Sequence, residues 1–266
     1  MIVNNPPSIA LLGLGEAGSA IAADLVAAGC DVSGWDPVPK PVHSAVRLAS
    51  SAHDAVAGAE VVLSVNLAAV AVEVAAEVAP ALADGALYAD LNTATPRIKR
   101  EAAAPVQARG NDFVDVALMA PVPGRGIATP SLASGSGAAA LATAMIPLGM
   151  SLRVIGELPG EAAERKLLRS VFAKGLAVAA LEALTAARAA GREEWLHEHL
   201  AETLEEADGA LLDRLLEGSV THSLRRTEEM RAAASMLAEL GTPARVSEAA
   251  ADWFEQLTRE KESSVG

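Results

Sequence analysis

Aromatic residues and cysteine are scarce in this chain of 266 residues. Aromatic side chains make up 3% of the sequence, and Cys30 is the single cysteine. One cysteine excludes an internal disulfide framework and fits a reducing compartment. Because 51% of the residues are apolar, we expect a sizeable core, but one built from Ala, Val and Leu. Such a core suits closely packed helices and a parallel sheet.

Basic residues are also in the minority, with 21 Lys and Arg against 34 Asp and Glu and a formal net charge of −13. They form no long run, so we expect neither nucleic acid nor a membrane as a partner. A small anionic substrate stays compatible with this charge, because one basic pocket is enough to bind it. The five histidines are scattered and none is paired with the cysteine at a metal-ligand spacing, so no metal site is expected.

Long hydrophobic runs are absent as well. No stretch of about 20 uncharged apolar residues occurs. Residues 1–7 show no basic segment followed by an apolar core and a cleavage site. We therefore expect a soluble, cytoplasmic protein.

The sequence does contain a strand–turn–helix–strand pattern between Ile9 and Asp36, which is typical of a dinucleotide-binding unit. In its G-x-G-x-x-G motif the first glycine allows a sharp turn. The second lets the backbone approach a pyrophosphate, and the third allows the helix to pack closely on the strand. The helix N-terminus offers N–H groups to the phosphates, and the acid about 20 residues further on accepts ribose hydroxyls. The predicted cofactor-binding residues of this stretch are Gly13, Leu14, Gly15, Glu16, Ala17, Gly18 and Asp36.

The choice between NAD and NADP depends on the residues after the second strand. A carboxylate at Asp36 repels the 2′-phosphate of NADP, which favours NAD. Lys40 follows in the next loop and is long enough to reach a 2′-phosphate, so both cofactors stay open.

Strand and helix patterns alternate as far as Ile155, with one helix expected over 69–82, and this predicts an α/β fold with a doubly wound sheet of the Rossmann type. Ligands of such sheets bind at the carboxyl ends of the strands. Asn66, Asn92 and Thr93 follow two of these ends and are expected to line the nicotinamide end of the cofactor site. Thr95 and Pro96 have the signature of a helix start.

The pattern changes at Pro159-Gly160 and is helical from there on, with helices predicted over 161–190, 193–217, 223–239 and 243–262. The predicted domains are therefore 1–158, a dinucleotide-binding Rossmann domain, and 159–266, an all-helical substrate and dimerisation domain. Lys166, Ser170 and Lys174 fall at i, i+4 and i+8 of the first of these helices and share one stripe of its surface. Spacing alone leaves two interpretations open, a reactive lysine or an ordinary solvated face.

The motifs GLGEAG, DLNTATP, VDVALMAPVPGRG and GEAAERKLLRSVFAKG together resemble the β-hydroxyacid dehydrogenase family. That family includes 3-hydroxyisobutyrate and 6-phosphogluconate dehydrogenases, and the chain is most similar to the branch with a phosphogluconate-dehydrogenase-like C-terminal domain. The resemblance implies an NAD(P)-dependent enzyme, expected as a homodimer. It would transfer hydride between nicotinamide and a small hydroxy acid, phosphorylated or not, or its carbonyl form.

By the same resemblance, Lys166 matches the catalytic lysine, a general acid/base on the substrate hydroxyl. Ser170 stands where the family has asparagine, and Pro123-Gly124-Arg125 where it has Ser-Gly-Gly. The serine hydroxyl that would bind a carboxylate is lost, while Arg125 offers a bidentate donor. Ala173 replaces an acid of the phosphogluconate enzymes, which puts decarboxylation in doubt, so the substrate is not inherited.

Further substrate-binding candidates are Lys174, His222 and Arg226, the last two sharing a helix face at i, i+4. In relatives this part of a partner subunit can reach the active site, which allows an anion contact across subunits. Local ion pairs with Glu228 and Glu229 are the simpler interpretation. Two other functions stay open: imine reduction on the same fold, against which the retained lysine argues, and a dinucleotide sensor without turnover.

Overall fold

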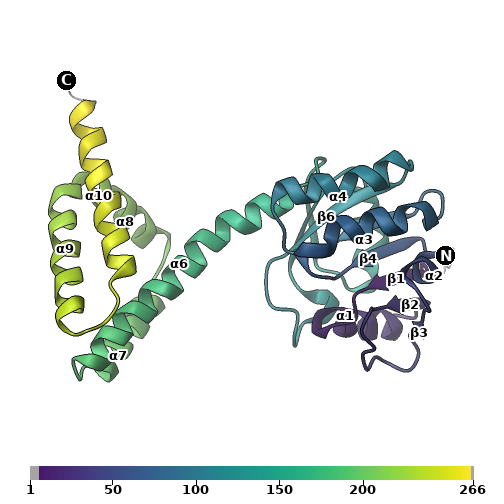
Figure 1. The fold of residues 1–266 in the computed structure, drawn as a ribbon, viewed down its shortest axis with the longest axis horizontal. Helices are drawn as coiled ribbons and strands as arrows, with labels where there is room; N and C mark the ends of the chain where they lie inside the picture. Colours follow the sequence, from purple (N-terminus) through teal and green to yellow (C-terminus); the bar gives the residue numbers. More distant parts are fainter. Residues whose placement is uncertain (1–5, 265–266) are drawn as a thin grey trace. The chain divides into compact units, whose positions relative to one another are not determined.

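The computed structural model describes residues 6–264, so residues 1–5, on which part of the signal-peptide expectation rests, lie outside it. The chain forms two compact units, Met1–Arg169 and Ser170–Gly266 (Figure 1). The boundary predicted after residue 158 lies just before helix α6 (Glu161–Ala189), whereas the first unit extends to Arg169 and includes the first turns of α6. Among the described residues, no helix is long and apolar enough to cross a membrane.

The first unit is built on one sheet of eight strands in the order β3-β2-β1-β4-β5-β6-β7-β8. Neighbouring strands are parallel except β6 and β7, which are antiparallel. The chain leaves β1 toward β2 on one side and returns to β4 on the other, so the point where the strand order reverses lies between β1 and β4. The strands are β1 (Ile9–Leu12), β2 (Val32–Trp35), β3 (Arg47–Leu48), β4 (Val61–Ser64), β5 (Leu87–Asp90), β6 (Asp112–Leu118), β7 (Ser131–Ser134) and β8 (Leu152–Gly156).

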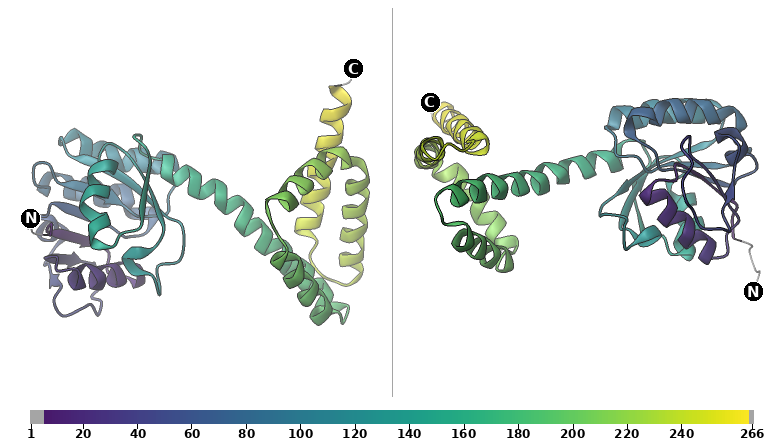
Figure 2. Two further views of the ribbon diagram at one scale, coloured as in Figure 1. Left: turned by 180° about the vertical axis from the view of Figure 1, so that it is seen from behind. Right: turned by 60° about the horizontal axis from the view of Figure 1, so that its bottom comes forward.

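Helices cover both faces of this sheet, as Figures 1 and 2 show for α1 on one face and α3 and α4 on the other. Side chains alternate along β1, with Ile9 and Leu11 in one core cluster and Leu12 in the other. The helices of this unit are α1 (Glu16–Ala27), α2 (Ala52–Val56), α3 (Ala71–Val78), α4 (Pro96–Ala108) and α5 (Ala138–Met145). The predicted Rossmann-type doubly wound sheet is confirmed.

Helices and strands of this unit were predicted correctly where the sequence has a clear helix cap or a run of apolar residues. Helix α4 begins at Pro96, and the Thr95 hydroxyl accepts the Ile98 N–H at 3.4 Å, as the cap signature predicted. The helix expected over 69–82 is shorter, because one-turn 3₁₀ segments flank α3 at Ala68–Val70 and Ala79–Ala81. The sequence patterns missed β3 and α2, which are only two and five residues long.

The second unit is all helical, with α7 (Glu193–Glu205), α8 (Gly209–Thr221), α9 (Ser223–Glu239) and α10 (Arg245–Ser263) following the end of α6. The prediction of one helix over 193–217 is wrong. The chain breaks before Asp208, whose carboxylate accepts the Leu211 N–H at 2.8 Å and starts α8, while Gly218, the expected end, lies inside α8. Together with the sheet of the first unit, these helices confirm the predicted fold class.

Candidate active site

The glycine motif forms the turn between β1 and α1, and each glycine has a distinct environment. Gly13 has a φ of +100°, and a side chain there would overlap the Val65 carbonyl and the Asn66 side chain. A Cβ at Gly18 would overlap the Gly13 carbonyl oxygen, so α1 packs directly on the turn. No atom lies within 4 Å of the place where a Cβ of Gly15 would be. Only the middle glycine therefore leaves open space, where a pyrophosphate can approach the backbone.

The first turn of α1 is suited to an anion. Gly15 is its N-cap residue, and no side chain of the described residues caps the helix there. The first N–H groups of a helix have no partner within it and carry a partial positive charge. Leu14 is buried, whereas Gly15 and Glu16 are exposed and Ala17 is partly exposed. The residues present fit the phosphates of a dinucleotide.

Asp36 lies at the end of β2 and is bonded to the glycine turn. Its carboxylate accepts the Leu14 N–H and the Val38 N–H, each at 2.9 Å. A carboxylate has about four lone-pair sites, so two remain for ribose hydroxyls. Asp36 therefore has a second role that the sequence did not indicate: it joins the end of β2 to the glycine turn.

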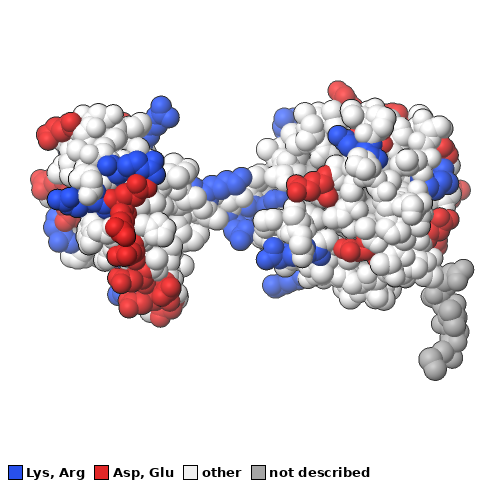
Figure 3. All heavy atoms as spheres, turned by 90° about the horizontal axis from the view of Figure 1, so that it is seen from below, with Lys and Arg blue, Asp and Glu red and all other residues white. Residues whose placement is uncertain are grey.

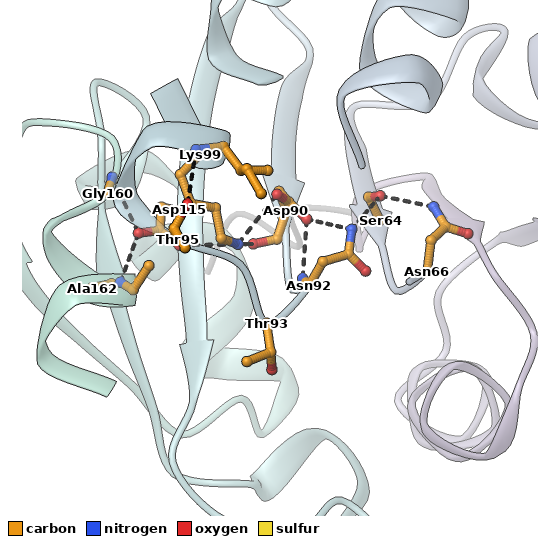
Figure 4. A network of polar contacts seen from close by, with 12 residues as sticks. Ser64, Asn66, Asp90, Asn92, Thr93, Thr95, Lys99, Asp115, Gly160 and Ala162 are labelled. Atoms are coloured by element: carbon orange, nitrogen blue, oxygen red, sulfur yellow. Dashed lines mark hydrogen bonds and ion pairs between the residues drawn. The ribbon is translucent and has the colours of Figure 1, made fainter. Parts of the chain in front are cut away.

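Asn66 and Asn92 meet at the carboxyl ends of β4 and β5, as Figure 4 shows. Asn66 Nδ2 donates to Ser64 Oγ at 3.0 Å, and Asn92 Nδ2 lies 3.3 Å from the same oxygen. Asn92 is 4% exposed, and its Oδ1 is buried with no hydrogen-bond partner among the described residues. A buried carbonyl oxygen without a partner is unfavourable, which fits an amide donor of a bound ligand.

Lys166 and Thr93, predicted from separate motifs, lie together. Lys166 Nζ donates to Thr93 Oγ1 at 2.7 Å, although the two residues are 73 positions apart. Thr93 follows β5 and is exposed, and Lys166 is partly exposed on the second turn of α6. An amine is thereby held beside the strand ends where the nicotinamide is expected.

The remaining candidates on α6 lie further along the helix. Ser170 is partly exposed and Lys174 is exposed, and both belong to the second unit. Arg169 is the last residue of the first unit, and its Nη1 donates to the Met119 carbonyl at 3.2 Å. The helix therefore contacts the beginning of the loop that follows β6.

That loop contains Pro123, Gly124 and Arg125, and all three are exposed. Its far end is fixed to α1, because the Asp24 carboxylate accepts the Ile127 N–H at 2.8 Å. The candidate substrate loop is thus attached to the dinucleotide helix.

His222 and Arg226 belong to the second unit. Arg226 Nη1 donates to Ser219 Oγ at 2.7 Å, and its guanidinium lies 5.8 Å from the centre of the Phe254 ring. The neighbouring Arg225 pairs with Glu229 at 3.7 Å. Arg225 therefore forms the local ion pair that the simpler interpretation expects. Arg226 instead contacts a serine hydroxyl and an aromatic ring, and forms an ion pair with no glutamate of the described residues.

Sequence reasoning missed a buried lysine close to this site. Lys99 is 1% exposed and forms ion pairs with Asp90 and Asp115. The signal was present, since Lys99 shares the buried face of α4 with Ala102, Ala103 and Val106 at helical spacing. A charge on the apolar face of an amphipathic helix predicts a buried partner.

Comparison with known proteins agrees with this geometry. The model of the NAD binding domain of 6-phosphogluconate dehydrogenase matches residues 8–142, and a domain of unknown function, DUF1932, matches residues 187–257. An uncharacterized 28.5 kDa protein of Methanothermus fervidus is 32% identical over 148 residues, which are 54% of this chain and 55% of that protein. The match thus spans about half the length of this curated relative.

Two solved structures extend the similarity to nearly the whole chain. A conserved protein of unknown function, described as structurally similar to 3-hydroxyacid dehydrogenases, is 27% identical, with a TM-score of 0.63 over 94% of this chain and 98% of that one. A reductive aminase from Aspergillus terreus, solved in complex with NADPH4, cyclohexanone and allyl amine, is 22% identical, with a TM-score of 0.79 over 96% and 94% of the chains, and shows a shared fold. The resemblance found in the motifs is confirmed: the chain belongs to the family of the NAD binding domain of 6-phosphogluconate dehydrogenase.

Proposed function

We propose that this protein is an NAD(P)-dependent oxidoreductase. It interconverts a small hydroxy acid, phosphorylated or not, and its carbonyl form, with Lys166 as general acid/base. The observation that carries the proposal is the 2.7 Å contact between Lys166 Nζ and Thr93 Oγ1, at the carboxyl end of β5 in an NAD-binding domain. Hydroxyacid dehydrogenases need a positioned proton donor and acceptor beside the hydride site, and an amine held there provides one.

Each residue then has a defined task. The turn at Gly13, Gly15 and Gly18 holds the pyrophosphate on the N–H groups of α1, and Asp36 accepts ribose hydroxyls. Bound nicotinamide supplies or takes up the hydride. Lys166 Nζ takes the proton from the substrate hydroxyl oxygen in one direction and returns it in the other. Thr93 accepts a hydrogen bond from Nζ and so keeps the amine aimed at the strand ends.

The substrate is proposed to be anionic. Basic side chains follow the exposed part of α6, as Figure 3 shows, although the chain carries a net charge of −13. Arg165 and Arg169 flank Lys166 on this helix, and Arg125 is exposed in the loop after β6. Guanidinium groups bind carboxylate and phosphate in a bidentate geometry, which supports a hydroxy acid with or without a phosphate.

The preferred cofactor is proposed to be NAD. Asp36 is fixed by hydrogen bonds from Leu14 in the glycine turn and from Val38 in the following loop, so its charge cannot move away from an adenosine 2′-phosphate without breaking them. Replacement of Asp36 by Asn removes that charge and leaves one acceptor oxygen, so the side chain can keep the bond from Leu14 or from Val38 but not both. We expect NADP affinity to gain relative to NAD in this variant.

A homodimer through the helical unit is also proposed. Large apolar side chains are exposed on α6 and α8, among them Val178 at 50%, Leu181 at 64% and Leu216 at 60%. Apolar surface of this kind on a soluble chain marks an interaction site. Sedimentation of the full chain would test the proposal, and a concentration-independent monomer would contradict it.

The central experiment is a dehydrogenase screen with NAD and NADP over hydroxy acids with and without phosphate, followed by Lys166→Ala. Loss of a general acid/base lowers kcat by about 10²- to 10⁴-fold, whereas the dissociation constant of the dinucleotide stays within about twofold. Lys261→Ala, an exposed lysine at the end of α10, is the matched control. An unchanged kcat in Lys166→Ala would remove the mechanism.

The same screen separates the two rival functions. An imine panel reduced faster than the carbonyl panel would favour imine reduction, which the shared fold with a reductive aminase permits. Dinucleotide binding without turnover on either panel would favour a sensor.

A further inference from the structure

A row of four buried polar residues crosses four neighbouring strands of the sheet. Ser64, Asp90, Asp115 and Ser134 are direct neighbours on β4, β5, β6 and β7, and each is at most 1% exposed. We call them the polar row. Buried polar groups are unfavourable unless they are bonded, so what each one holds indicates what the row does.

A single buried lysine pairs with both carboxylates at the centre of the polar row. Lys99 Nζ lies 3.2 Å from Asp90 Oδ2 and 3.0 Å from Asp115 Oδ1, and it donates to the Asp90 backbone carbonyl at 2.8 Å (Figure 4). Groups this deeply buried do not contact a substrate. Any effect on the reaction must pass through the residues that they hold.

On one side, the polar row holds the start of α6. Asp115 Oδ2 accepts the N–H of Gly160 at 3.2 Å and of Ala163 at 2.9 Å, while Ser134 Oγ accepts the N–H of Ala162 at 3.0 Å. These bonds fix the first turn of the helix to the sheet. Lys166 stands three residues after Ala163, about one helical turn along.

On the other side, the row holds the end of β5. Asp90 Oδ1 accepts the Asn92 N–H at 3.0 Å, and Lys99 binds the Asp90 carbonyl. Thr93 follows directly. The Cβ of a residue replacing Gly160 would lie 2.9 Å from the Pro96 carbonyl oxygen, so the start of α6 also lies close against the start of α4.

Stability alone does not account for two carboxylates and an ammonium in this place. Buried ion pairs lose their hydration, and apolar residues of similar volume are often equally stable or more so. What the charges provide is a fixed arrangement of three elements, β5, β6 and α6, through bonds that allow one geometry.

We infer that Lys99 and Asp115 are positioning residues for Lys166: they fix the start of α6 relative to the end of β5 and so keep the Lys166 amine on Thr93. This inference rests on the proposed role of Lys166. It predicts that loss of the Asp115 bonds releases the amine even when the fold and the dinucleotide site persist.

Asp115→Asn is the most informative change, because it leaves one ammonium and one carboxylate, Lys99 and Asp90, as a balanced pair. Asp115 Oδ1 forms an ion pair with Lys99, and Oδ2 accepts two backbone N–H groups. An amide can accept on one side only, and its NH₂ then faces donors on the other. The variant must lose either the lysine or the start of α6.

Release of the amine can be measured without a substrate, by brief acetylation with acetic anhydride and peptide mass spectrometry. The readout is the labelling rate of Lys166 divided by that of the exposed Lys40. Thr93→Val removes the hydroxyl partner directly and gives the value for an amine that has lost its bond to Thr93. Asp112→Asn, on the exposed start of the same strand, gives the baseline.

We expect the ratio to rise about threefold in Asp115→Asn, as in Thr93→Val, and not to rise further when the two changes are combined. A ratio equal to that of Asp112→Asn, in a folded protein that binds dinucleotide, would overturn the inference. If Asp115→Asn does not fold, Lys99→Met decides, since it removes the other proposed positioning group: in a folded protein that binds dinucleotide, a raised ratio supports the inference and a baseline ratio overturns it. The proposed function fails separately, if Lys166→Ala keeps its kcat.

Discussion

Two helices that start in the first unit, α1 and α6, begin in opposite ways. The first turn of α1 has no side-chain cap among the described residues, whereas the backbone N–H groups at the start of α6 are bonded to Asp115 and Ser134. Both helix ends carry the same partial positive charge, and in both the first N–H groups have no partner within the helix. The open end of α1 is available to the phosphates of a ligand. The occupied end of α6 instead fixes the helix that carries Lys166.

Gly15 and Gly160, which precede these two helices, differ in the same way as the helix ends: one faces open space and the other faces protein atoms. Gly15 has open space where a Cβ would be, and Gly160, with a φ of +103°, lies against Pro96. A glycine can therefore mark the approach of a ligand or the approach of the protein's own backbone, and only the surroundings distinguish the two.

Gly18→Ala is expected to have the largest effect, because it disturbs the turn that presents the open end of α1. The new Cβ would overlap the Gly13 carbonyl oxygen, and backbone cannot move aside as a flexible side chain can. Overpacking of this kind costs about 3 kcal/mol of the free energy of unfolding. Thermal unfolding should show a lower Tm together with lost dinucleotide binding. Gly175→Ala, in open space within α6, is the control and should not lower the Tm.

Gly15→Ala separates binding from folding. Its φ of −64° suits alanine, and the methyl group meets no protein atom, so the Tm should stay unchanged. The same methyl group occupies the space of the pyrophosphate, and we expect the dinucleotide dissociation constant to rise about tenfold or more, or at least 1.4 kcal/mol. Isothermal titration calorimetry measures it.

Gly160→Ala should give the reverse result, a lower Tm with dinucleotide affinity retained. Equal behaviour of the two variants would contradict the distinction between the open and the occupied helix ends.

The sequence predicted the open end well and the occupied end poorly. The residues around the open end are close together in the chain, so their spacing alone predicts the strand, the turn and the helix. They are Gly13, Gly15, Gly18 and Asp36. The bonds of Asp115 to Gly160 and Ala163 join residues 45 and 48 positions apart, and no local pattern encodes them. The same holds for the contact of Lys166 with Thr93, which required the family resemblance to place the lysine in the site.

Helix boundaries show the same dependence on context. The residues from 193 to 217 are favourable for helix almost throughout, and this hid the break. The helix is interrupted at Asp208 because its carboxylate caps the Leu211 N–H. The sequence alone does not show this, because aspartate also occurs inside helices without capping them.

A third helix start, that of α10 in the second unit, lies between the two cases, and Glu182→Gln tests it. Glu182 accepts the Val246 N–H at 2.8 Å and the Ser247 N–H at 2.9 Å, and among residues 6–264 no salt bridge from a lysine to Glu182 is present. Partial burial raises the pKa of Glu182, but the hydrogen bonds from Val246 and Ser247 outweigh it and hold that pKa below its ordinary value. The variant should lose about 1 kcal/mol at pH 7, as for other caps.

The pH dependence follows from the lowered pKa of Glu182. Its contribution is fully present above the unfolded-state pKa of about 4.3 and is lost as the pH falls through the lower folded-state pKa. The difference between wild type and Glu182→Gln in urea unfolding should therefore be larger at pH 7 than below pH 4. Glu202→Gln, on the exposed surface of α7, should show no such difference. A difference that grows as the pH falls would mean that the neutral acid, and not the carboxylate, caps α10, and that a helix start in this protein needs no charge to be held.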